Sequence, residues 1–220
     1  PDLVCYKEAL EKRIQGSVLE RVRISSPFLL RTAVPPLSSV EGKKVIELRR
    51  LGKRICFGLE GDLWLVLHLM IAGRLHWYDE RGKAAKGRGL CVFDFTSGSL
   101  VLTEAGSQKR ASLHVVQGEA GLEKLDPGGL EVFDATTKEF ARALRAKNHT
   151  LKRALTDPRI LSGIGNAYSD EILFEAKLSP FVLTQKLTDS ELEKLFDAIK
   201  KTLTGWVERL RAESRERFPE

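Results

Sequence analysis

The stretch "LTDPRILSGIGNAYSDEILFEA", residues 155–176, joins two helical patterns through a connection that contains two glycines. An ordinary connection between helices needs only one glycine, as a C-cap. Here Gly163 and Gly165 flank Ile164, and the polar Asn166 follows at once. Glycine has no Cβ, so its backbone can come close to a ligand. The stretch therefore predicts two helices with a connection that a ligand can approach closely.

The helix expected to begin near Asn166 has free backbone N–H groups and a partial positive charge at its N-terminus. Together with the glycines, this is typical of a phosphate-binding corner. Lys152 and Arg153 lie just upstream and add positive charge, and the Asn166 amide offers a further donor. A tight corner between two helices, with Asn166 as an N-cap, explains the same residues. Local physics leaves both interpretations open.

Strand patterns fill the first half of the chain, after one helical pattern at residues 3–14. Several of the strand-like runs are separated by turns that contain glycine, namely "EGD", "ERG" and "TSGS". The short spacing favours an antiparallel sandwich or barrel over βαβ units. The runs are residues 17–25, 43–60, 62–70, 74–80, 90–104 and 111–117.

The apolar period becomes helical from residue 136 onward. Helices are predicted at residues 136–147, 151–156, 165–176 and 187–218, and Thr188 followed by Glu191 fits a capping box at the start of the last one. The glycine- and acid-rich residues 118–135 predict a linker. We therefore expect a β-rich domain at 1–117 and an all-α domain at 136–220. A cleft between two such halves is a common ligand site.

Composition gives weaker information about partners. The 220 residues include 36 Lys and Arg against 30 Asp and Glu, a net charge of +6 that mildly favours a polyanionic partner. On charge alone, an ordinary basic protein fits better. Cys5, Cys56 and Cys91 are far apart, which predicts neither disulfides nor a zinc site and fits a reducing compartment. No apolar run is long enough to span a membrane, and no signal peptide is visible, so we expect a cytoplasmic protein.

Residues 154–180, "ALTDPRILSGIGNAYSDEILFEAKLSP", closely resemble the helix-two-turn-helix of the formamidopyrimidine-DNA glycosylase and endonuclease VIII family. The family pattern is approximately L-D-Q-x-x-x-x-G-I-G-N-x-Y-x-x-E-x-L-F-x-A-x-I-x-P. Residues 52–75, "GKRICFGLEGDLWLVLHLMIAGRL", are similar to its segment G-K-x-L-x-F…L-x-x-H-L-G-M-S-G-x-L. The resemblance implies an α+β fold, with an N-terminal antiparallel β-sandwich that has a leading helix and a C-terminal all-α helix-two-turn-helix domain. It also implies that DNA binds in the cleft.

The chain opens Pro1-Asp2-Leu3, where the family opens Pro-Glu-Leu, and its one methionine is Met70. It is therefore either an internal fragment or a chain whose initiator Met was removed to expose Pro1. A free α-amino group has a pKa of about 7.7–8.0, so part of it is unprotonated at neutral pH. A secondary amine that attacks a sugar C1′ forms an iminium directly. By resemblance, Pro1 is the nucleophile of a glycosylase with AP-lyase activity.

Asp2 departs from the family, whose catalytic residue at this place is Glu. By resemblance, this carboxylate protonates the sugar ring oxygen and transfers protons. Aspartate is one methylene shorter, and a misplacement of about 1 Å can cost about 100-fold in rate. Activity is thus expected to be slowed, redirected or lost. The neighbouring Cys5 is better explained as a buried thiol than as a chemical group.

Lys53 and His68 align with a family lysine and histidine that contact phosphate beside the lesion, and we group Lys53 with the catalytic residues. Lys53 as a solvated turn residue and His68 as a half-buried one are the structural alternatives. For Lys53 alone or His68 alone, the structural interpretation would be preferred. The joint placement of the two favours phosphate contact.

A base-flipping enzyme must fill the gap left by the extruded nucleotide. Ile71 stands at the place of the family's inserted Met, and Lys109 and Arg110, in "SQKRASL" (107–113), match two family arginines. Ala111 replaces the wedge Phe. The resemblance thus implies DNA contacts for Ile71, Lys109 and Arg110, with an incomplete wedge and an altered lesion preference, such as for DNA that is already distorted.

The family usually carries a C-terminal zinc finger of four cysteines, and this chain ends "RAESRERFPE" without them. The finger is either truncated or naturally absent, and we expect no metal and no cofactor in this chain. The basic residues Arg209, Arg211, Arg215 and Arg217 are interpreted as solvated surface, with a substitute DNA contact as the alternative. The expected partner is double-stranded DNA with a lesion or abasic site, bound by a monomer, with DNA contacts also from Lys152, Gly163, Gly165 and Asn166.

Three functions remain open at this point. The first is a bifunctional base-excision glycosylase with AP-lyase activity. The second is a damaged-DNA-binding relative whose chemistry is weakened by Asp2. The third is a helix-two-turn-helix module that binds structured nucleic acid without a repair role. Which lesion is excised is not readable from the residues.

Overall fold

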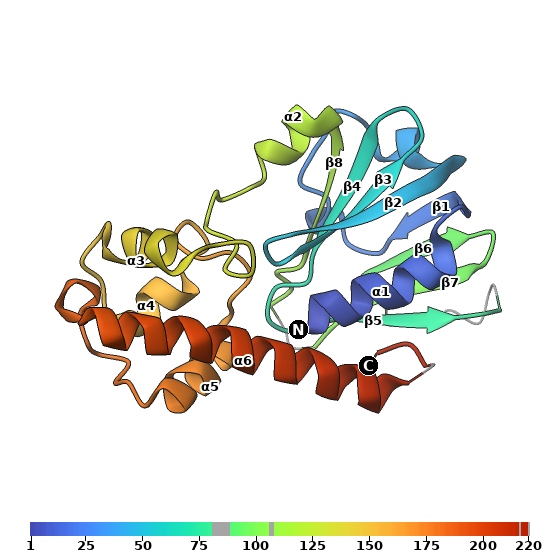
Figure 1. The fold of residues 1–220 in the computed structure, drawn as a ribbon. Coiled ribbons are helices and arrows are strands. Elements are labelled where there is room, and N and C mark those ends of the chain that lie inside the picture. Colours follow the sequence, from blue (N-terminus) through green and yellow to red (C-terminus); the bar gives the residue numbers. More distant parts are fainter. Residues whose placement is uncertain (81–88, 106–107, 216, 220) are drawn as a thin grey trace. The chain divides into compact units, whose positions relative to one another are not determined.

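The computed structural model describes residues 1–80, 89–105, 108–215 and 217–219 (Figure 1). The elements of the first half are α1 (Asp2–Ile14), β1 (Val18–Ile24), η1 (Pro27–Leu29), η2 (Leu37–Val40), β2 (Lys43–Leu51), β3 (Arg54–Leu59), β4 (Leu63–His68), β5 (Gly73–Tyr78), β6 (Cys91–Phe95), β7 (Gly98–Glu104) and β8 (Ser112–Gln117). Those that follow are α2 (Gly118–Glu123), α3 (Thr137–Arg145), α4 (Leu151–Thr156), α5 (Asn166–Ala176), η3 (Thr184–Lys186) and α6 (Asp189–Ser214). The predicted α+β class, with a leading helix, antiparallel strands and a helical second half, is confirmed.

The chain forms two compact units. The β unit comprises Asp2–Leu125 and Leu210–Glu220, and the helical unit comprises Pro1 and Asp126–Arg209. The division between Leu125 and Asp126 lies inside the predicted linker 118–135, whose first residues form α2.

The strands of the β unit pair in the order β5-β7-β6-β1-β2-β3-β4-β8. Every pairing is antiparallel, and β1 meets β2 only at Val18↔Lys44 and Leu19↔Lys43. This short joint lets the series fold into two halves that face one another. Phe57 in β3 and Phe93 in β6 are fully buried, and their rings stack with centroids 6.1 Å apart. The two halves thus enclose one apolar core, as in a sandwich.

The strand-like run predicted at 43–60 is in fact two strands. β2 and β3 are joined by a hairpin turn at Gly52 and Lys53, with Leu51 opposite Arg54. Gly52 has a φ of 57°, which glycine adopts without strain and which two-residue hairpin turns require. The flanking arginines and lysine obscure this turn in the sequence.

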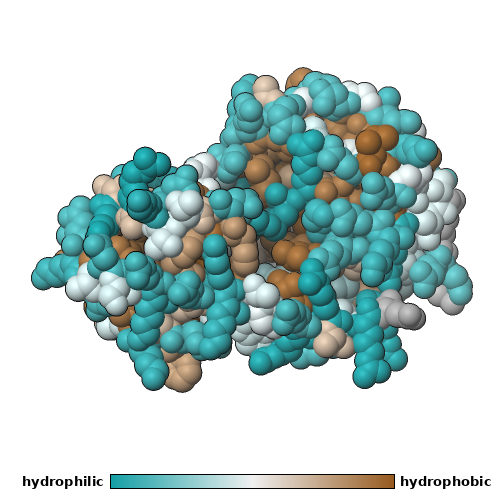
Figure 2. Space-filling model, viewed as in Figure 1, coloured by the Kyte–Doolittle hydropathy of each residue, from teal (hydrophilic) through white to brown (hydrophobic). Residues whose placement is uncertain are grey.

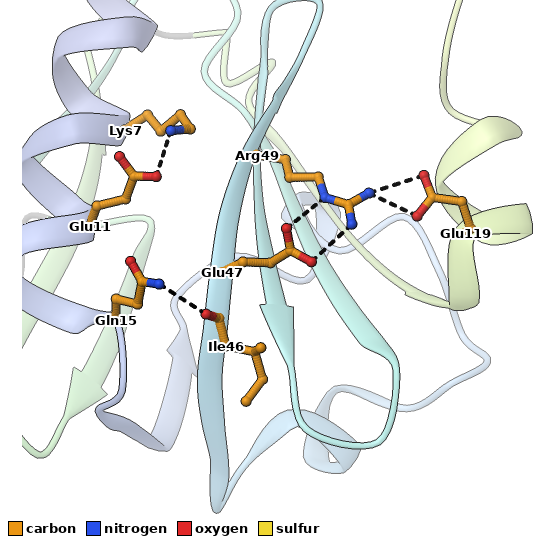
Figure 3. Close-up of polar contacts among 7 residues, drawn as sticks. All are labelled: Lys7, Glu11, Gln15, Ile46, Glu47, Arg49 and Glu119. Atoms are coloured by element: carbon orange, nitrogen blue, oxygen red, sulfur yellow. Dashed lines mark hydrogen bonds and ion pairs between the residues drawn. The ribbon is translucent and has the colours of Figure 1, made fainter.

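Helix α2 covers part of the outer face of the β2-β3-β4-β8 half. Its Leu122 is buried in an apolar cluster with Cys56, Trp64 and Val66. Arg49 is placed between the carboxylates of Glu47 and Glu119 (Figure 3), and its guanidinium lies 4.5 Å from the Trp64 ring centroid. Apolar burial and an exposed ion-pair network therefore both attach α2 to the sheet.

Helix α1 is attached to the same sheet by a polar contact at its end. The Gln15 side chain donates to the Ile46 carbonyl at 3.2 Å, and one turn earlier Lys7 and Glu11 pair along the helix (Figure 3). On its inner side, Leu10 and Ile14 are fully buried in the core of the β unit. The leading helix thus belongs to the β unit.

In the helical unit, side-chain caps define where two helices begin. Thr188 Oγ1 accepts the backbone N–H of Glu191 at 3.2 Å, and the Glu191 carboxylate accepts the Thr188 N–H at 2.9 Å. This is the predicted capping box. Thr136 and Glu139 form the same box at α3. Helix α6 ends at Ser214, before the predicted end at residue 218.

One face of the molecule is largely polar (Figure 2). On the face shown in Figure 2, hydrophilic side chains cover most of the visible area, and hydrophobic ones are visible in smaller patches. The large apolar side chains that are exposed include Ile71, Phe174 and Phe181. Among the described residues, none of the helices combines the length and hydropathy needed to cross a bilayer.

Two substitutions test whether apolar burial or ion pairing attaches α2 to the sheet. Leu122 is 4% exposed, and we expect Leu122→Ala to lower the free energy of unfolding by about 2–5 kcal/mol. The Arg49 and Glu119 side chains are 42% and 61% exposed, so Arg49→Met is expected to cost about 1 kcal/mol or less. Urea titrations followed by tryptophan fluorescence measure both variants. Equal losses would show that the ion pairs hold the helix as strongly as Leu122 does and would contradict this expectation.

Candidate functional site

The connection between α4 and α5 spans residues 157–165 and combines a left-handed glycine with an open helix end. Gly163 has a φ of 80°, a left-handed conformation that favours glycine. Gly165 is the N-cap of α5, in extended conformation, and no side chain caps this end. Asn166 is therefore the first residue of α5, and the alternative interpretation of Asn166 as an N-cap is wrong. The uncapped N-terminus has the donors and the partial charge that suit an anion.

Backbone and side-chain contacts brace this connection. Leu130 donates its N–H to the Ile160 carbonyl at 3.0 Å, and Ser162 donates to the Leu130 carbonyl at 2.9 Å. Ile164 is buried, with 2% exposure. At the start of the connection, hydrogen bonds from Arg159 lower the pKa of Asp157 to about 2. The glycines therefore lie in a fixed loop.

Lys152 links α4 to the first turn of α5. Its Nζ donates to the Asn166 carbonyl at 2.9 Å and lies 2.5 Å from the Asp170 carboxylate. The structure thus brings Lys152 to Asn166 at the glycine corner. Its charge is shared with Asp170, which the sequence analysis missed, so a phosphate at this corner would compete with that carboxylate. Arg153 is exposed.

In the β unit, Lys53 and His68 come together near one end of β3 and β4. Lys53 lies in the β2–β3 turn, and the next residue, Arg54, is directly opposite His68. Burial, followed by the charge of Arg54, lowers the pKa of Lys53. Burial lowers the pKa of His68 to about 4, with further contributions from Arg54, Lys53 and His114. His68 is therefore neutral at pH 7 among positive groups that could bind an anion.

The turn between β4 and β5 presents two apolar side chains. Ile71 is 79% exposed and Met70 is 43% exposed. Met70 has a φ of 56°, which is rare for a residue with a long side chain. The quoted family pattern H-L-G-M-S-G has glycine at this position, which explains the backbone conformation. Met70 is thus an exposed neighbour of Ile71 that the sequence analysis did not place in the site.

A buried carboxylate shapes the loop that carries Lys109 and Arg110. Glu104 is 8% exposed, and it accepts the backbone N–H groups of Arg110 at 3.0 Å and Ala111 at 3.2 Å. Lys109 Nζ donates to the Glu104 carbonyl. Ala111 is buried, with 3% exposure, and Ser107 of the aligned stretch is outside the described residues. Nothing in the sequence pattern indicated that Glu104 accepts hydrogen bonds from this loop.

Strand pairing brings these two loops to the same end of the β unit. Gly73, which ends the β4–β5 turn, is opposite Glu104, and His68 is opposite Ser112. Ile71, Lys109 and Arg110 therefore lie on loops that neighbour the strand end of His68. Together they could contact an extended polyanion.

At the N-terminus, Pro1 directly precedes α1, whose first residue is the exposed Asp2. One turn later, Tyr6 Oη accepts the Leu75 N–H at 3.4 Å. Burial raises the pKa of the Cys5 thiol, with a smaller contribution from Glu8. Cys5 is therefore a protonated, buried thiol near neutral pH.

The basic end of α6 is less free than the sequence suggests. Arg211 forms a two-point ion pair with Glu8, with one contact at 2.9 Å. The Arg209 guanidinium lies 4.4 Å from the Trp206 ring centroid. Both side chains are nevertheless exposed, which agrees with the interpretation of this end as surface.

The predicted site residues divide between the units. The β unit holds Asp2, Lys53, His68, Ile71, Lys109 and Arg110, and the helical unit holds Pro1, Lys152, Gly163, Gly165 and Asn166. Within residues 1–80, 89–105, 108–215 and 217–219, no cluster of three or more His, Cys, Asp or Glu side chains could hold a metal ion.

Comparison with known proteins covers nearly the whole chain. Residues 1–110 match the formamidopyrimidine-DNA glycosylase N-terminal domain, and residues 128–216 match the formamidopyrimidine-DNA glycosylase H2TH domain. The chain is 32% identical over 211 residues to formamidopyrimidine-DNA glycosylase of Carboxydothermus hydrogenoformans, covering 94% of this chain and 76% of the relative. It is also 32% identical to the enzyme of the same name from Heliobacterium modesticaldum, covering 94% and 78% of the two chains.

Solved structures agree with the sequence relatives. The MutM (Fpg) protein of Thermus thermophilus has a TM-score of 0.81 at 28% identity, over 94% of this chain and 75% of that one. The Lactococcus lactis formamidopyrimidine-DNA glycosylase, described as bound non-covalently to DNA that contains an AP site, has a TM-score of 0.85 at 25% identity, over 94% and 81%. With both domains matched in order and relatives at this identity, the chain belongs to the formamidopyrimidine-DNA glycosylase family.

Proposed function

We propose that this chain is a base-excision DNA repair glycosylase with AP-lyase activity, which acts on damaged bases or abasic sites through the amine of Pro1. One observation carries the proposal: the family match begins at residue 1, where the chain has a proline directly before α1. The proposal requires that the mature protein begins at Pro1.

The chemistry follows from the secondary amine. Its nitrogen lone pair attacks C1′, and the damaged base leaves with the bonding electrons. At an existing abasic site, the amine adds to the open aldehyde instead, and water leaves. On the first route, the amine nitrogen then loses its proton, and the C1′–O4′ bond breaks as O4′ gains one. Both routes thus yield an iminium between Pro1 and C1′. The iminium makes the C2′ hydrogens acidic, and loss of one of them expels the 3′ phosphate by β-elimination.

Asp2 is the proposed acid of this reaction. As the sugar ring opens, its O4′ must gain a proton, and a carboxyl group next to the nucleophile can supply it. Asp2 is exposed at the first position of α1, beside Pro1. Because its side chain is one methylene shorter than that of Glu, we expect slower proton transfer.

The duplex is held, in this proposal, by groups from both units. In the β unit these are Lys53 and His68, and in the helical unit they are Lys152 and the open N-terminus of α5 at Asn166. The L. lactis relative described as bound to AP-site DNA supports a damaged duplex as the partner. The proposed DNA-binding form is a monomer.

A second candidate function is a damaged-DNA-binding protein of the same fold with weakened chemistry. The specific observation in its favour is Asp2 in place of the family Glu. This candidate retains the phosphate contacts and loses turnover, so chemistry rather than binding distinguishes the two.

The main proposal predicts a covalent adduct. With sodium borohydride and a duplex that contains one abasic site, the iminium is reduced to a stable amine, and the trapped complex migrates as a single heavier species on a denaturing gel. In the blocked variant, Pro1 is replaced by Gly and one further residue is added before it. Its terminal amine is primary and lies one residue away from the position of the Pro1 amine, so it should give no adduct. Mass spectrometry of the unaltered protein verifies that it begins at Pro1.

An adduct that survives in the blocked variant would assign the nucleophile to another amine and contradict the role of Pro1. Binding to the abasic duplex without any adduct would favour the weakened alternative. Equal affinity for abasic and intact duplexes would contradict both.

Asp2→Glu tests the acid. If Asp2 is a shortened family acid, the variant should release damaged base faster by about 10- to 100-fold, since about 1 Å of misplacement costs about 100-fold. Single-turnover assays on duplexes with one defined oxidised base measure the change. Asp2→Asn serves as the control and should be slower than the unaltered protein. A slower Asp2→Glu variant would show that the site is built around the shorter side chain.

A further inference from the structure

Three basic side chains lie on the outer face of the β2-β3-β4-β8 half. Arg54 is opposite His68, His68 is opposite Ser112, and His114 is opposite Val66. Residues that are paired, or that are two apart in one strand, share a face of the sheet. Arg54, His68 and His114 are thus neighbours on the face that α2 covers farther along, away from the buried core.

Two atoms in this group lack partners. Arg54 Nε and His114 Nδ1 are both buried, and neither has a hydrogen-bond partner among the protein groups that the structure describes. Buried polar atoms in native proteins are nearly always paired, and each exception calls for an explanation. A ligand that accepts hydrogen bonds could accept one from Arg54 Nε. It could accept a second one from His114 Nδ1 when that nitrogen carries the proton.

The charge around these atoms is of one sign. The groups that act on His68 are Arg54, Lys53 and His114, and all lower its pKa. Burial lowers the pKa of His114, with further contributions from Arg54 and Arg31. In the part of the chain that the structure describes, every charged group that shifts the pKa of either imidazole is therefore basic. A cluster of this kind suits an anion.

Arg49 provides a contrast on the same sheet. Its guanidinium is held by the carboxylates of Glu47 and Glu119, which compensate its charge. No such carboxylate bonds to Arg54 Nε among the described residues. The two arginines thus differ in role: Arg49 attaches α2, and Arg54 has binding capacity left for a ligand.

We propose that Arg54 and His114 together hold a second phosphate of the DNA backbone, next to the phosphate expected at Lys53 and His68. This inference rests on the proposed function. A phosphodiester is a compact anion with several acceptor oxygens, and it can accept from the guanidinium and from an imidazole N–H at once. Arg54 and His114 would add a phosphate contact along the DNA strand without touching any base. Their contribution to affinity would therefore be independent of the DNA sequence.

The test is a salt titration of DNA binding with a matched control. Fluorescence anisotropy measures the affinity for a duplex with an abasic-site analogue, for the unaltered protein, Arg54→Gln, His114→Gln and Lys53→Ala. Arg21→Gln is the control, because Arg21 is exposed on β1, which is in the other half of the sandwich. We expect Arg54→Gln to weaken binding by about tenfold and to reduce the salt slope by about 0.9, as loss of one phosphate contact would. Arg21→Gln should change neither quantity.

Thermal unfolding distinguishes this role from a structural one. Replacing an arginine whose buried Nε is unpaired should leave the unfolding midpoint unchanged or raise it. Arg54→Gln with a lower midpoint and an unchanged salt slope would assign Arg54 to the fold and overturn the proposal.

The imidazoles provide a second readout, since the chain has four histidines. In the free protein, His68 and His114 should be neutral at pH 7, because their pKa values lie below the usual one. NMR titration with the duplex should shift the His114 resonances and raise the pKa of His114, because an anion favours the protonated form. His76, which bonds Thr103 at 2.9 Å outside this cluster, is the internal reference.

Failures of the two proposals can be separated. Normal borohydride trapping with an unchanged slope in Arg54→Gln and an unresponsive His114 overturns the second phosphate contact alone. Absence of trapping, with binding that depends on Arg54 and His114, overturns the lyase chemistry alone. An unaltered protein that does not bind the duplex overturns both.

Discussion

Alternation of side chains across β3, β4 and β8 is the constraint on which the β unit depends. Ile55, Phe57 and Leu67 point into the core and are fully buried, and the residues between them face outward. A slip of one residue in register would expose phenyl rings and bury a guanidinium, so the core enforces the pairing. The positions of Arg54, His68 and His114 follow from this pairing. Packing on one face thus places the charge on the other.

In the helical unit, hydrogen bonds and the burial of one side chain hold the residues expected to bind phosphate. Its connection between α4 and α5 contains glycines, which alone would be free to move, but the pairing of Leu130 with Ile160 and Ser162 and the burial of Ile164 hold it. Lys152 then links the two helices through the Asn166 carbonyl and Asp170. The result is an uncapped helix N-terminus in a fixed loop, which suits an anion without a large conformational cost.

Departures from the family pattern gather at one end of the β unit. Met70 takes a backbone conformation that glycine adopts freely, and Ala111 is buried where the family has a wedge. Beside Ala111, the Glu104 carboxylate accepts the backbone N–H groups of Arg110 and Ala111. Places where a sequence breaks local rules are often functional, and here they coincide with the loops expected to fill the gap left by the extruded nucleotide.

The sequence by itself determined the helices other than α2, most strands, the capping box at Thr188 and the glycine corner, because period, caps and turns depend on neighbours along the chain. It also indicated Lys53 and His68 through the family pattern. It did not reveal the turn at Gly52, the hydrogen bonds from the Lys109–Arg110 loop to Glu104, or the proximity of Arg54 to His114. Only the tertiary structure decided these. Arg54 and His114 meet because β3, β4 and β8 pair in one register, and the burial of side chains from distant segments selects that register.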